Sequence, residues 1–279
     1  MITYNHKSYI RQAVESIMMQ QTDFAVELFI GDDNSTDGTT DICNELVHEY
    51  PGRINLTVNS VNIGPSENAI NIFRKCSGAK YIAICEGDDY WCDEYKLQKQ
   101  VDFLEANDEY AICFHEVMVL RENGQKEFYN NIEVNKSFNV VDLAHNNFIA
   151  TVSCLFRVYD HFKIFPTWYK GFAGNDYGLK LLNATKGEIY YIKDCMAVYR
   201  VHNGGIWSSQ THTEMYENGI KVIDSLNEAF NFEYNEQFEI AKKLRHERFY
   251  PQQNIMVEES EYARLKSKLK DYLSKIGLT

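Results

Sequence analysis

The stretch KYIAICEGDDYW, residues 80–91, passes from an apolar run into three carboxylates within four positions, Glu86, Asp88 and Asp89. The apolar run is typical of a buried strand. Like charges at such close spacing repel one another, and each carboxylate resists ionising beside the others. The stretch therefore predicts a strand whose end holds a site for a positively charged group.

A second stretch of the same kind, AVELFIGDD at 25–33, predicts another strand that ends in Asp32 and Asp33. Residues 53–58 form a third strand-like run. Helical patterns separate these runs, and the expected helices span 8–20, 39–50, 66–75 and 93–107. Alternating strands and helices favour a mostly parallel sheet that binds its ligand at the carboxyl ends of the strands. Both acidic stretches lie at such ends.

Further along the chain the alternation weakens. The expected strands of a mixed continuation of the sheet span 110–120, 151–158 and 187–192. From Glu214 onward the pattern is helical. We expect an α/β fold with a mixed sheet flanked by helices, divided into a domain over 1–210 and a C-terminal helical extension over 211–279. The opening MITYNH resembles the end of a strand and its turn, which indicates a truncated chain or a strand that starts late.

The composition narrows the function classes. The 279 residues carry a formal net charge of -12, so a nucleic-acid-binding surface, which needs basic residues, is not expected. The seven cysteines include no CxxC pair, which argues against a zinc ribbon and favours a reducing cytosol. No signal peptide and no apolar run of about 18 residues is present, and a cytoplasmic protein is expected.

The stretch GDDNSTDGT, residues 31–39, leaves two interpretations open. Residues 34–37 can cap the helix that follows. Two successive aspartates exceed what a cap needs, however, and an acid after a Rossmann-like strand accepts hydrogen bonds from a nucleotide base or ribose. Asp32 and Asp33 are therefore candidate nucleotide ligands.

The stretch EGDDYW, residues 86–91, also has two interpretations. Carboxylates around a flexible glycine suit a hard divalent cation that keeps some waters and binds phosphate oxygens of a substrate. The alternative is a solvated acidic turn.

Four motifs follow in order, namely TYNH at 3–6, IGDDNSTDGT at 30–39, NIGPSENAI at 62–70 and EGDDYW at 86–91. In this order they resemble the inverting glycosyltransferases of family 2, of the bacterial polysaccharide type. The resemblance covers roughly residues 1–207 and implies the GT-A fold, which has a Rossmann-like mixed sheet.

The resemblance implies a nucleotide site at the strand ends. The first motif would line this site with Thr3, Tyr4 and Asn5. Asp33 would hold the uracil or ribose, with Asp32 behind it. Three residues of the third motif would lie near the base and ribose, namely Asn62, Gly64 and Asn68.

The resemblance also places EGDD at the family's DxD motif, which chelates Mn²⁺ or Mg²⁺ together with the diphosphate. Glu86 departs from the aspartate that the family has at the first position, and its longer arm changes how the ribose would be held. The metal is therefore assigned to Asp88, with Asp89 in support.

Downstream, the stretch 171–187 is expected to open a helix at Asp176. A carboxylate at a helix N-terminus is favoured electrostatically, so a helix cap is one interpretation. The resemblance implies the other, because Asn175-Asp176 stands where the family has a Glu-Asp pair with its catalytic base. Such a base would deprotonate the acceptor hydroxyl on the face opposite the leaving diphosphate.

The stretch YRVHNGGIW, residues 199–207, alternates Arg200 and His202 on a short expected strand. Related enzymes close the diphosphate site with a loop in this region. The resemblance therefore implies that His202 contacts the metal or the pyrophosphate and that Trp207 forms part of the acceptor wall. Arg200 either neutralises the phosphates or pairs with an acid in the sheet.

The C-terminal stretch repeats apolar residues at helical spacing, namely Tyr262, Leu265, Leu269, Tyr272 and Ile276. They would pack on the domain or form a homodimer with a second copy of the chain. The same stretch is basic through Arg264, Lys266, Lys268 and Lys270. These residues form either a solvated face or a peripheral contact with the inner face of a membrane.

Together these patterns indicate an enzyme that moves a hexosyl or N-acetylhexosaminyl group from a UDP-sugar to a hydroxyl of a glycan or lipid-linked acceptor. One alternative is a nucleotidyltransferase, although a glycine-rich basic phosphate loop is absent from the opening residues. Another is a non-catalytic sugar-nucleotide-binding protein, which would not need both Asp88 and Asp176.

Overall fold

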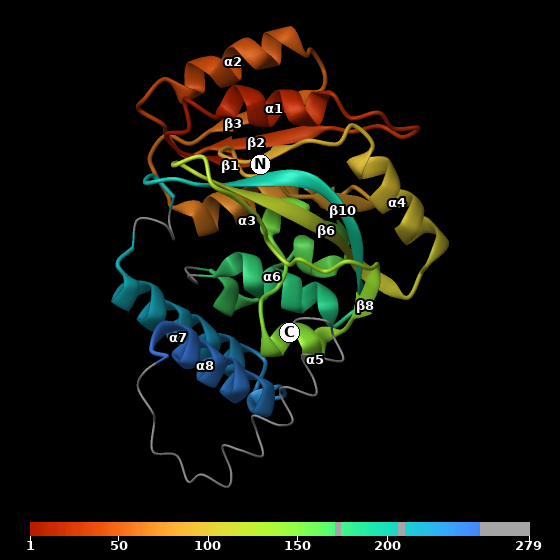
Figure 1. The fold of residues 1–279 in the computed structure, drawn as a ribbon. Coiled ribbons are helices and arrows are strands. Elements are labelled where there is room, and N and C mark those ends of the chain that lie inside the picture. The colour runs from red at the N-terminus through yellow and green to blue at the C-terminus, as the bar shows by residue number, and fades with distance from the viewer. Residues whose placement is uncertain (171–173, 206–209, 252–279) are drawn as a thin grey trace, which may run out of the picture.

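The computed structural model describes residues 1–170, 174–205 and 210–251 and arranges them as a mixed α/β fold (Figure 1). The strands form two neighbouring sheets, one of three strands and one of seven. Helices cover both faces of these sheets. This is the fold class that the sequence predicts.

The amino-terminal part alternates strands and helices as expected. Its elements are β1 (Ile2–Thr3), α1 (Ile10–Met18), β2 (Leu28–Asp32), α2 (Thr39–Glu49), β3 (Ile54–Val58) and α3 (Pro65–Cys76). The three strands are parallel, in the order β1-β2-β3. The residues that follow each strand therefore leave the sheet at the same edge.

The second sheet is mixed, as expected for the later part of the chain. Its strands are β4 (Tyr81–Ala83), β5 (Tyr90–Trp91), β6 (Tyr110–Arg121), β7 (Lys126–Phe128), β8 (Lys136–Phe138), β9 (Leu155–Arg157) and β10 (Glu188–Val201). Their order is β4-β9-β6-β10-β5, with β7 beside β6 and β8 beside β10. The central pair β6 and β10 is parallel, whereas β9 is antiparallel to both β4 and β6.

Helices and short 3-10 turns connect these strands. The helices are α4 (Lys96–Ala106), α5 (Val140–His145), α6 (Asn175–Ala184), α7 (His212–Ala229) and α8 (Asn235–Phe249), and the 3-10 turns are Thr151–Ser153, Asp160–Phe162 and Thr167–Tyr169. In Figure 1, α1 and α2 lie over one face of the sheets, and α5 to α8 lie beyond the other. None of the helices in the described part of the chain has the length and apolar character to cross a membrane.

Three predicted strands have different bounds in the structure. The strand expected within 80–89 spans only Tyr81–Ala83, so that residues 84–89, which include the acidic residues, follow the strand instead of ending it. The first residues of 151–158 form a 3-10 turn instead of strand. The strand expected to stop at 192 continues to Val201, because β10 pairs along its length with β6, β8 and β5. The length of a strand depends on the neighbouring strands with which it pairs, and the apolar character of its own sequence does not reveal where that pairing ends.

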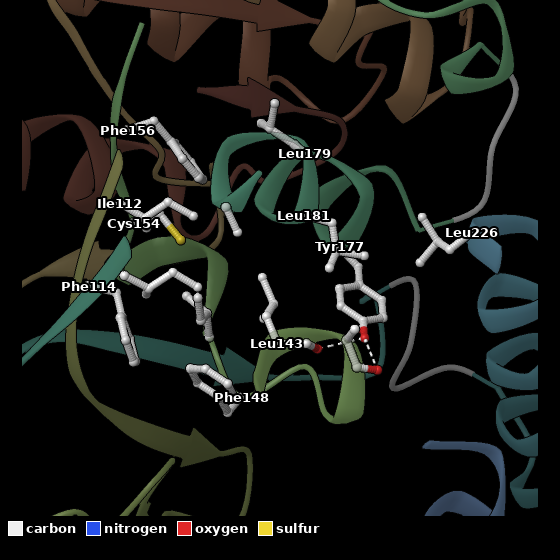
Figure 2. Packing of buried hydrophobic residues seen from close by; sticks show 14 of the residues in the cluster. Ile112, Phe114, Leu143, Phe148, Cys154, Phe156, Tyr177, Leu179, Leu181 and Leu226 are labelled. Atoms are coloured by element: carbon white, nitrogen blue, oxygen red, sulfur yellow. Dashed lines mark hydrogen bonds between the residues drawn. The ribbon is translucent and has the colours of Figure 1, made fainter. Parts of the chain in front are cut away.

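The sheets separate two apolar cores. Strand β6 contributes to both, because successive side chains of a strand point to opposite faces. Ile112 and Phe114 belong to the core beneath α3, α5 and α6, whereas Cys113 belongs to the core beneath α1 and α4. The first of these cores surrounds α6, as Figure 2 shows.

Helix α6 is held at its buried face by apolar packing and one polar contact. The hydroxyl of Tyr177 donates to the carbonyls of Leu143 and Ala144 in α5, at 2.8 and 3.2 Å (Figure 2). Because a buried hydroxyl without a partner is costly, these bonds allow the aromatic ring to fill the core. They also fix the start of α6, where Asp176 lies.

Helices α7 and α8 pack on the rest of the chain through the same core, to which Leu226 and Phe238 contribute fully buried side chains. The boundary at residue 210 stays a prediction. The apolar and basic stretch at 262–276, with the dimer and membrane contacts expected there, lies outside the described residues.

A buried polar network joins α4 to the second sheet. Gln100 is fully buried, and its amide donates to the carbonyls of Cys113 and Ser153 at 2.8 and 2.9 Å. Its side-chain oxygen accepts from the ammonium of Lys96 at 2.7 Å, which in turn lies 4.1 Å from the ring centroid of Trp91. Burial lowers the pKa of Lys96 to about 8. The network therefore connects the strand after the acidic turn to α4 and β6.

We expect Gln100→Leu to lower the free energy of unfolding by about 2–4 kcal/mol, because it leaves the ammonium of Lys96 and two carbonyls unpaired in the core. Urea unfolding followed by circular dichroism measures this change. A matched control is Gln98→Leu on the same helix, whose amide bonds Asp102 near the surface and for which a loss below about 1 kcal/mol is expected. Equal losses in the two variants would contradict the role of the network.

Candidate active site

The acidic turn of residues 86–89 lies where the two sheets meet. The N–H of Gly87 donates to the carbonyl of Ile2 at 3.0 Å and so extends the hydrogen bonding of β1. A Cβ on Gly87 would lie 2.6 Å from Oγ1 of Thr3 and 2.9 Å from Nδ1 of His6. Position 87 therefore has no room for a side chain, and because it is glycine the turn can pass directly over the end of β1.

The carboxylate of Asp88 faces two histidines. Its Oδ2 lies 3.1 Å from Nε2 of His202 and 3.7 Å from Nε2 of His6. Burial alone would raise the pKa of Asp88, but the hydrogen bond to His202 and the charge of His6 outweigh it and hold this pKa below its usual range. Asp88 is therefore expected to be ionised at neutral pH.

Asp89 points away from the histidines and into the protein. It is 2% exposed and accepts a hydrogen bond from the backbone N–H of Arg200 at 2.8 Å. Burial and the charges of Asp88 and Glu86 raise the pKa of Asp89. The guanidinium of Arg200 donates to the carbonyl of Asp88 and to Gln12. Arg200 and Asp89 thus hold the turn against β10.

Glu86 is the carboxylate of the turn that has one oxygen without a partner among the described residues. Its Oε2 is buried and has no hydrogen-bond partner in the described part of the chain. Burial and the charges of Asp88 and Asp176 raise the pKa of Glu86 to about 7. Since hard divalent cations prefer carboxylate and water oxygens, this orphaned oxygen beside Asp88 fits such a cation.

The turn does not by itself complete a metal site. Over residues 1–170, 174–205 and 210–251, no three His, Cys, Asp or Glu side chains are arranged to hold a metal ion together. Cations such as Mg²⁺ commonly keep several waters and bind phosphate oxygens in addition to one or two carboxylates. The remaining ligands would therefore come from water and from a phosphate-bearing substrate.

The two aspartates after β2 have different positions. Asp32 is fully buried and accepts from the backbone N–H of Ser35 at 3.1 Å and from the hydroxyl of Thr40. These bonds give Asp32 a structural role in the turn before α2, and its contact with a nucleotide stays a prediction. Asp33 lines the cavity and accepts from the backbone N–H of Gly64 at 2.8 Å.

The first motif, Thr3 to Asn5, lies at the end of β1 and in the loop that follows it. The side chain of Thr3 is buried, whereas Tyr4 is 43% exposed, and both residues line the cavity. Asn5 has a left-handed backbone with φ of 56°. Its side-chain oxygen accepts from the N–H of Thr36 at 2.8 Å, and its own N–H donates to the hydroxyl oxygen of Ser35 at 2.9 Å. Asn5 therefore joins the loops that follow β1 and β2.

The third motif packs α3 against β2 and reaches the cavity through Asn62. Gly64 precedes the helix with φ of 86°, which favours glycine. Asn68 is 2% exposed and its amide donates to the carbonyl of Gly31 at 2.8 Å. A Cβ on Gly31 would lie 2.5 Å from Oδ1 of Asn68. The close approach of α3 thus depends on a glycine in β2.

Asp176 lies in the first turn of α6, with its side chain 39% exposed. Its Oδ2 accepts from the buried ammonium of Lys180 at 2.9 Å and from the hydroxyl of Thr151 at 3.1 Å. Lys180 also donates to the carbonyl of Ile149 at 2.7 Å. Burial would raise the pKa of Asp176, but Lys180 and Thr151 outweigh it and lower this pKa. Asp176 is therefore an ionised carboxylate held in one orientation.

One cavity brings these groups together. It is lined by the carboxylates of the acidic turn and by Asp176. The charge of Asp176 reaches Glu86 and contributes to its raised pKa. Residues separated by about ninety positions in the sequence thus share one electrostatic environment.

Sequence reasoning missed His6, Lys180 and Thr151. His6 was within reach, because it belongs to the motif TYNH and follows three predicted site residues directly. Lys180 stands one helical turn after Asp176, a spacing that allows an ion pair. Thr151 gives no comparable signal, since its contact depends on the tertiary fold. The predicted acceptor-wall residue Trp207 lies outside the described residues.

Comparison with known proteins identifies the family. The family model described as glycosyl transferase family 2 matches residues 1–201. The relative "Uncharacterized protein Rv1520" of Mycobacterium tuberculosis (strain ATCC 25618 / H37Rv) is 37% identical over 209 residues, which cover 75% of this chain and 59% of that protein. The chain therefore spans less than two thirds of the length of this relative.

Solved structures share the fold. The S. aureus protein TarS 1-349 in complex with UDP-GlcNAc superposes with a TM-score of 0.66 and 18% identity, covering 98% of this chain and 79% of that chain. The mannosyltransferase PcManGT from Pyrobaculum calidifontis, in complex with GDP-Man and Mn²⁺, gives a TM-score of 0.60 and 16% identity, covering 98% of this chain and 78% of that chain. The likeness confirms the GT-A fold expected from the sequence.

The pair of Lys180 and Asp176 generates a prediction about stability. Lys180→Met removes the cation from a carboxylate and leaves the carbonyl of Ile149 unpaired, so we expect a loss of about 2 kcal/mol in the free energy of unfolding near pH 7. Because the pKa of Asp176 is lowered in the folded protein, its stabilising contribution is present above the unfolded pKa, for which 3.8 is the usual value, and is lost as pH falls through the folded value.

The loss caused by Lys180→Met should therefore stay constant between about pH 7 and about pH 4, and shrink only below the usual value of 3.8, as the pH falls through the lowered pKa of Asp176. Urea unfolding across this range measures the difference between the variant and the wild type. Lys186→Met is the control, because Lys186 is exposed two residues after the end of α6. A loss for Lys180→Met that stays constant down to about pH 2 would contradict the pairing.

Proposed function

The chain belongs to glycosyl transferase family 2, and we propose that it transfers a sugar from a nucleotide-diphosphate donor to an acceptor hydroxyl. The expected nucleotide is UDP, and the expected acceptor is a glycan or a lipid-linked sugar. The complexes of TarS with UDP-GlcNAc and of PcManGT with GDP-Man support a nucleotide-sugar donor for this fold.

The observation that carries the proposal is the convergence of the acidic turn and Asp176 on one cavity. Glu86 and Asp88 supply negative charge on one side, beside buried polar atoms that have no partner among the described residues. Asp176 supplies an ionised carboxylate on the other side, oriented by Lys180. A donor diphosphate beside the turn would leave the anomeric carbon between the two sets of groups.

We assign the divalent cation, Mn²⁺ or Mg²⁺, to Asp88 and Glu86, with Asp89 and His202 in support. A cation bound there would supply charge compensation for the departing diphosphate. Asp89 acts from inside the protein, since its carboxylate bonds the backbone of Arg200. His202 orients Asp88 through the contact of 3.1 Å between Nε2 and Oδ2.

On the donor side, we assign the base and ribose to the residues at the ends of β1 and β2. Asp33 fixes the loop at Gly64 and lines the cavity with Asn62 and Tyr4. The exposed ring of Tyr4 provides an aromatic surface for a base. Thr3 contributes a buried hydroxyl without a partner among the described residues.

On the acceptor side, Asp176 is the proposed general base. Its carboxylate accepts the proton of the acceptor hydroxyl while the acceptor oxygen forms a bond to the anomeric carbon. The bond between that carbon and the diphosphate oxygen breaks with its electron pair on the leaving group, which inverts the configuration. The low pKa of Asp176 keeps the carboxylate deprotonated before the reaction and limits its strength as a base, so Lys180 serves mainly to orient it.

The cation assignment predicts that UDP binds more tightly in the presence of Mn²⁺ or Mg²⁺ and that Asp88→Asn removes this dependence. Isothermal titration calorimetry with and without the ion measures the difference in affinity. The control is Asp108→Asn, whose side chain is 96% exposed and lies outside the cavity lining. Equal UDP affinity with and without the ion in the wild type would contradict the assignment of a cation to Asp88.

The base assignment predicts that Asp176→Asn lowers the rate of sugar transfer by about 10²- to 10⁴-fold. UDP affinity should change little, because Asp176 acts on the acceptor. Asp160→Asn, whose side chain is 97% exposed, is the matched control. Single-turnover transfer with a competent acceptor is the decisive measurement. If the Asp176→Asn rate stays within about threefold of the wild type, well short of a general-base effect, a non-catalytic role for this carboxylate is favoured.

A further inference from the structure

The loop after β7 brings an aromatic ring to the cavity. Tyr129 lines the cavity together with Asp176 and Lys180, and it is 39% exposed. Its ring belongs to neither apolar core. Its backbone N–H donates to the carbonyl of Val117 in β6 at 2.9 Å, so the base of the side chain is fixed to the central part of the sheet.

A buried carboxylate holds this loop in place. Glu116 is 4% exposed and accepts from the backbone N–H groups of Asn130 and Asn131, at 3.0 and 2.7 Å. The hydroxyl of Tyr191 donates to it at 3.0 Å, and the N–H of Val117 donates at 2.9 Å. A buried carboxylate is unfavourable unless its oxygens are satisfied, and here four donors satisfy them.

The loop is further fixed on its far side. Ile132 is 6% exposed and packs in the core around α6, and its carbonyl accepts from Tyr191 at 3.2 Å. Asn131 adopts a left-handed backbone with φ of 58°, which lets two successive N–H groups point at one carboxylate. The residues on both sides of Tyr129 are therefore anchored, while its ring faces the cavity.

The ring lies on the side of the cavity that holds the proposed base. The pKa of Tyr129 is raised, mainly by burial. The nearby charge of Lys180 opposes this shift, and the charge of Asp176 adds to it. The hydroxyl of Tyr129 therefore lies within electrostatic reach of Asp176 and Lys180, with which it lines the cavity.

We propose that Tyr129 determines acceptor specificity by stacking on a sugar ring of the acceptor, and that Glu116 positions Tyr129 for this contact. The proposal rests on the proposed function and specifies its acceptor class as a sugar that presents an apolar C–H face beside its reacting hydroxyl. An anchored aromatic ring offers a large apolar contact area at little loss of conformational entropy. A sugar stacked on Tyr129 would present its hydroxyls toward Asp176.

The proposal is tested with simple sugars in place of the acceptor. Methyl β-glucoside, methyl β-galactoside and methyl β-N-acetylglucosaminide are each added to the full chain in the presence of UDP and Mn²⁺. Saturation-transfer NMR then measures which sugar protons contact the protein. For at least one of these sugars we expect saturation on the ring C–H protons and an affinity about tenfold weaker in Tyr129→Ala. Tyr129→Phe should retain the wild-type affinity, because it keeps the ring.

The positioning role of Glu116 is tested separately. Glu116→Gln puts an amide N–H₂ where backbone donors converge, so the loop should shift and sugar affinity should fall while UDP affinity stays unchanged. Glu127→Gln is the control, because Glu127 is exposed on the same hairpin and pairs with Arg121. Loss of UDP binding together with sugar binding in Glu116→Gln would indicate general unfolding and remove the positioning role.

The outcomes separate this proposal from the proposed function. If UDP binds and none of the three sugars contacts the wild type, or if Tyr129→Ala binds them as tightly as the wild type, the stacking proposal is overturned and the glycosyltransferase proposal stands. If no UDP binding is detected with any divalent cation, the proposed donor is wrong, whatever the sugars do.

Discussion

The active site depends on the close passage of Gly87 over the end of β1. The strands of the first sheet and those of the second meet at this point, and the bond from Gly87 to Ile2 joins them. No side chain fits between the turn and the residues Thr3 and His6. Because the backbone is held this closely, the carboxylates on either side of the glycine have fixed directions. Asp88 faces the cavity and the histidines, and Asp89 faces the strand that carries Arg200.

This fixed geometry concentrates four carboxylates around one cavity. Neighbouring donors and cations stabilise the charge of only some of them. Asp88 and Asp176 have partners that lower their pKa values, whereas Glu86 and Asp89 have raised pKa values because of burial and neighbouring charges. Uncompensated charge at a functional site is a common sign that binding supplies what the protein lacks. The proposed cation, bound together with a nucleotide diphosphate, would supply both the missing positive charge and the missing ligands.

The order of motifs was sufficient to predict the fold class and the edge of the sheet where the site lies. It also placed Asp88, His202 and Asp176, which the structure brings to one region. The sequence favoured Asp33 over Asp32 as the nucleotide ligand, but it did not reveal that both carboxylates are buried and accept hydrogen bonds from neighbouring loops. Lys180 and Glu116 were missed for a related reason. A buried charge is recognised by all of its partners. Lys180 has one nearby partner in Asp176, but its other partners, and most of those of Glu116, come from distant parts of the chain.

The two cores on opposite faces of the sheet affect how the sequence can diverge. Substitutions far apart and without shared partners combine additively in their effects on stability. Changes in the core beneath α1 and α4 can therefore accumulate without altering the energetics of the core around α6, and a loss on one face can be offset by a gain on the other. Coupling between the faces is concentrated in β6, where Cys113 and Phe114 project into different cores from adjacent positions. The core around α6 can thus be repacked while the core beneath α1 and α4 stays unchanged.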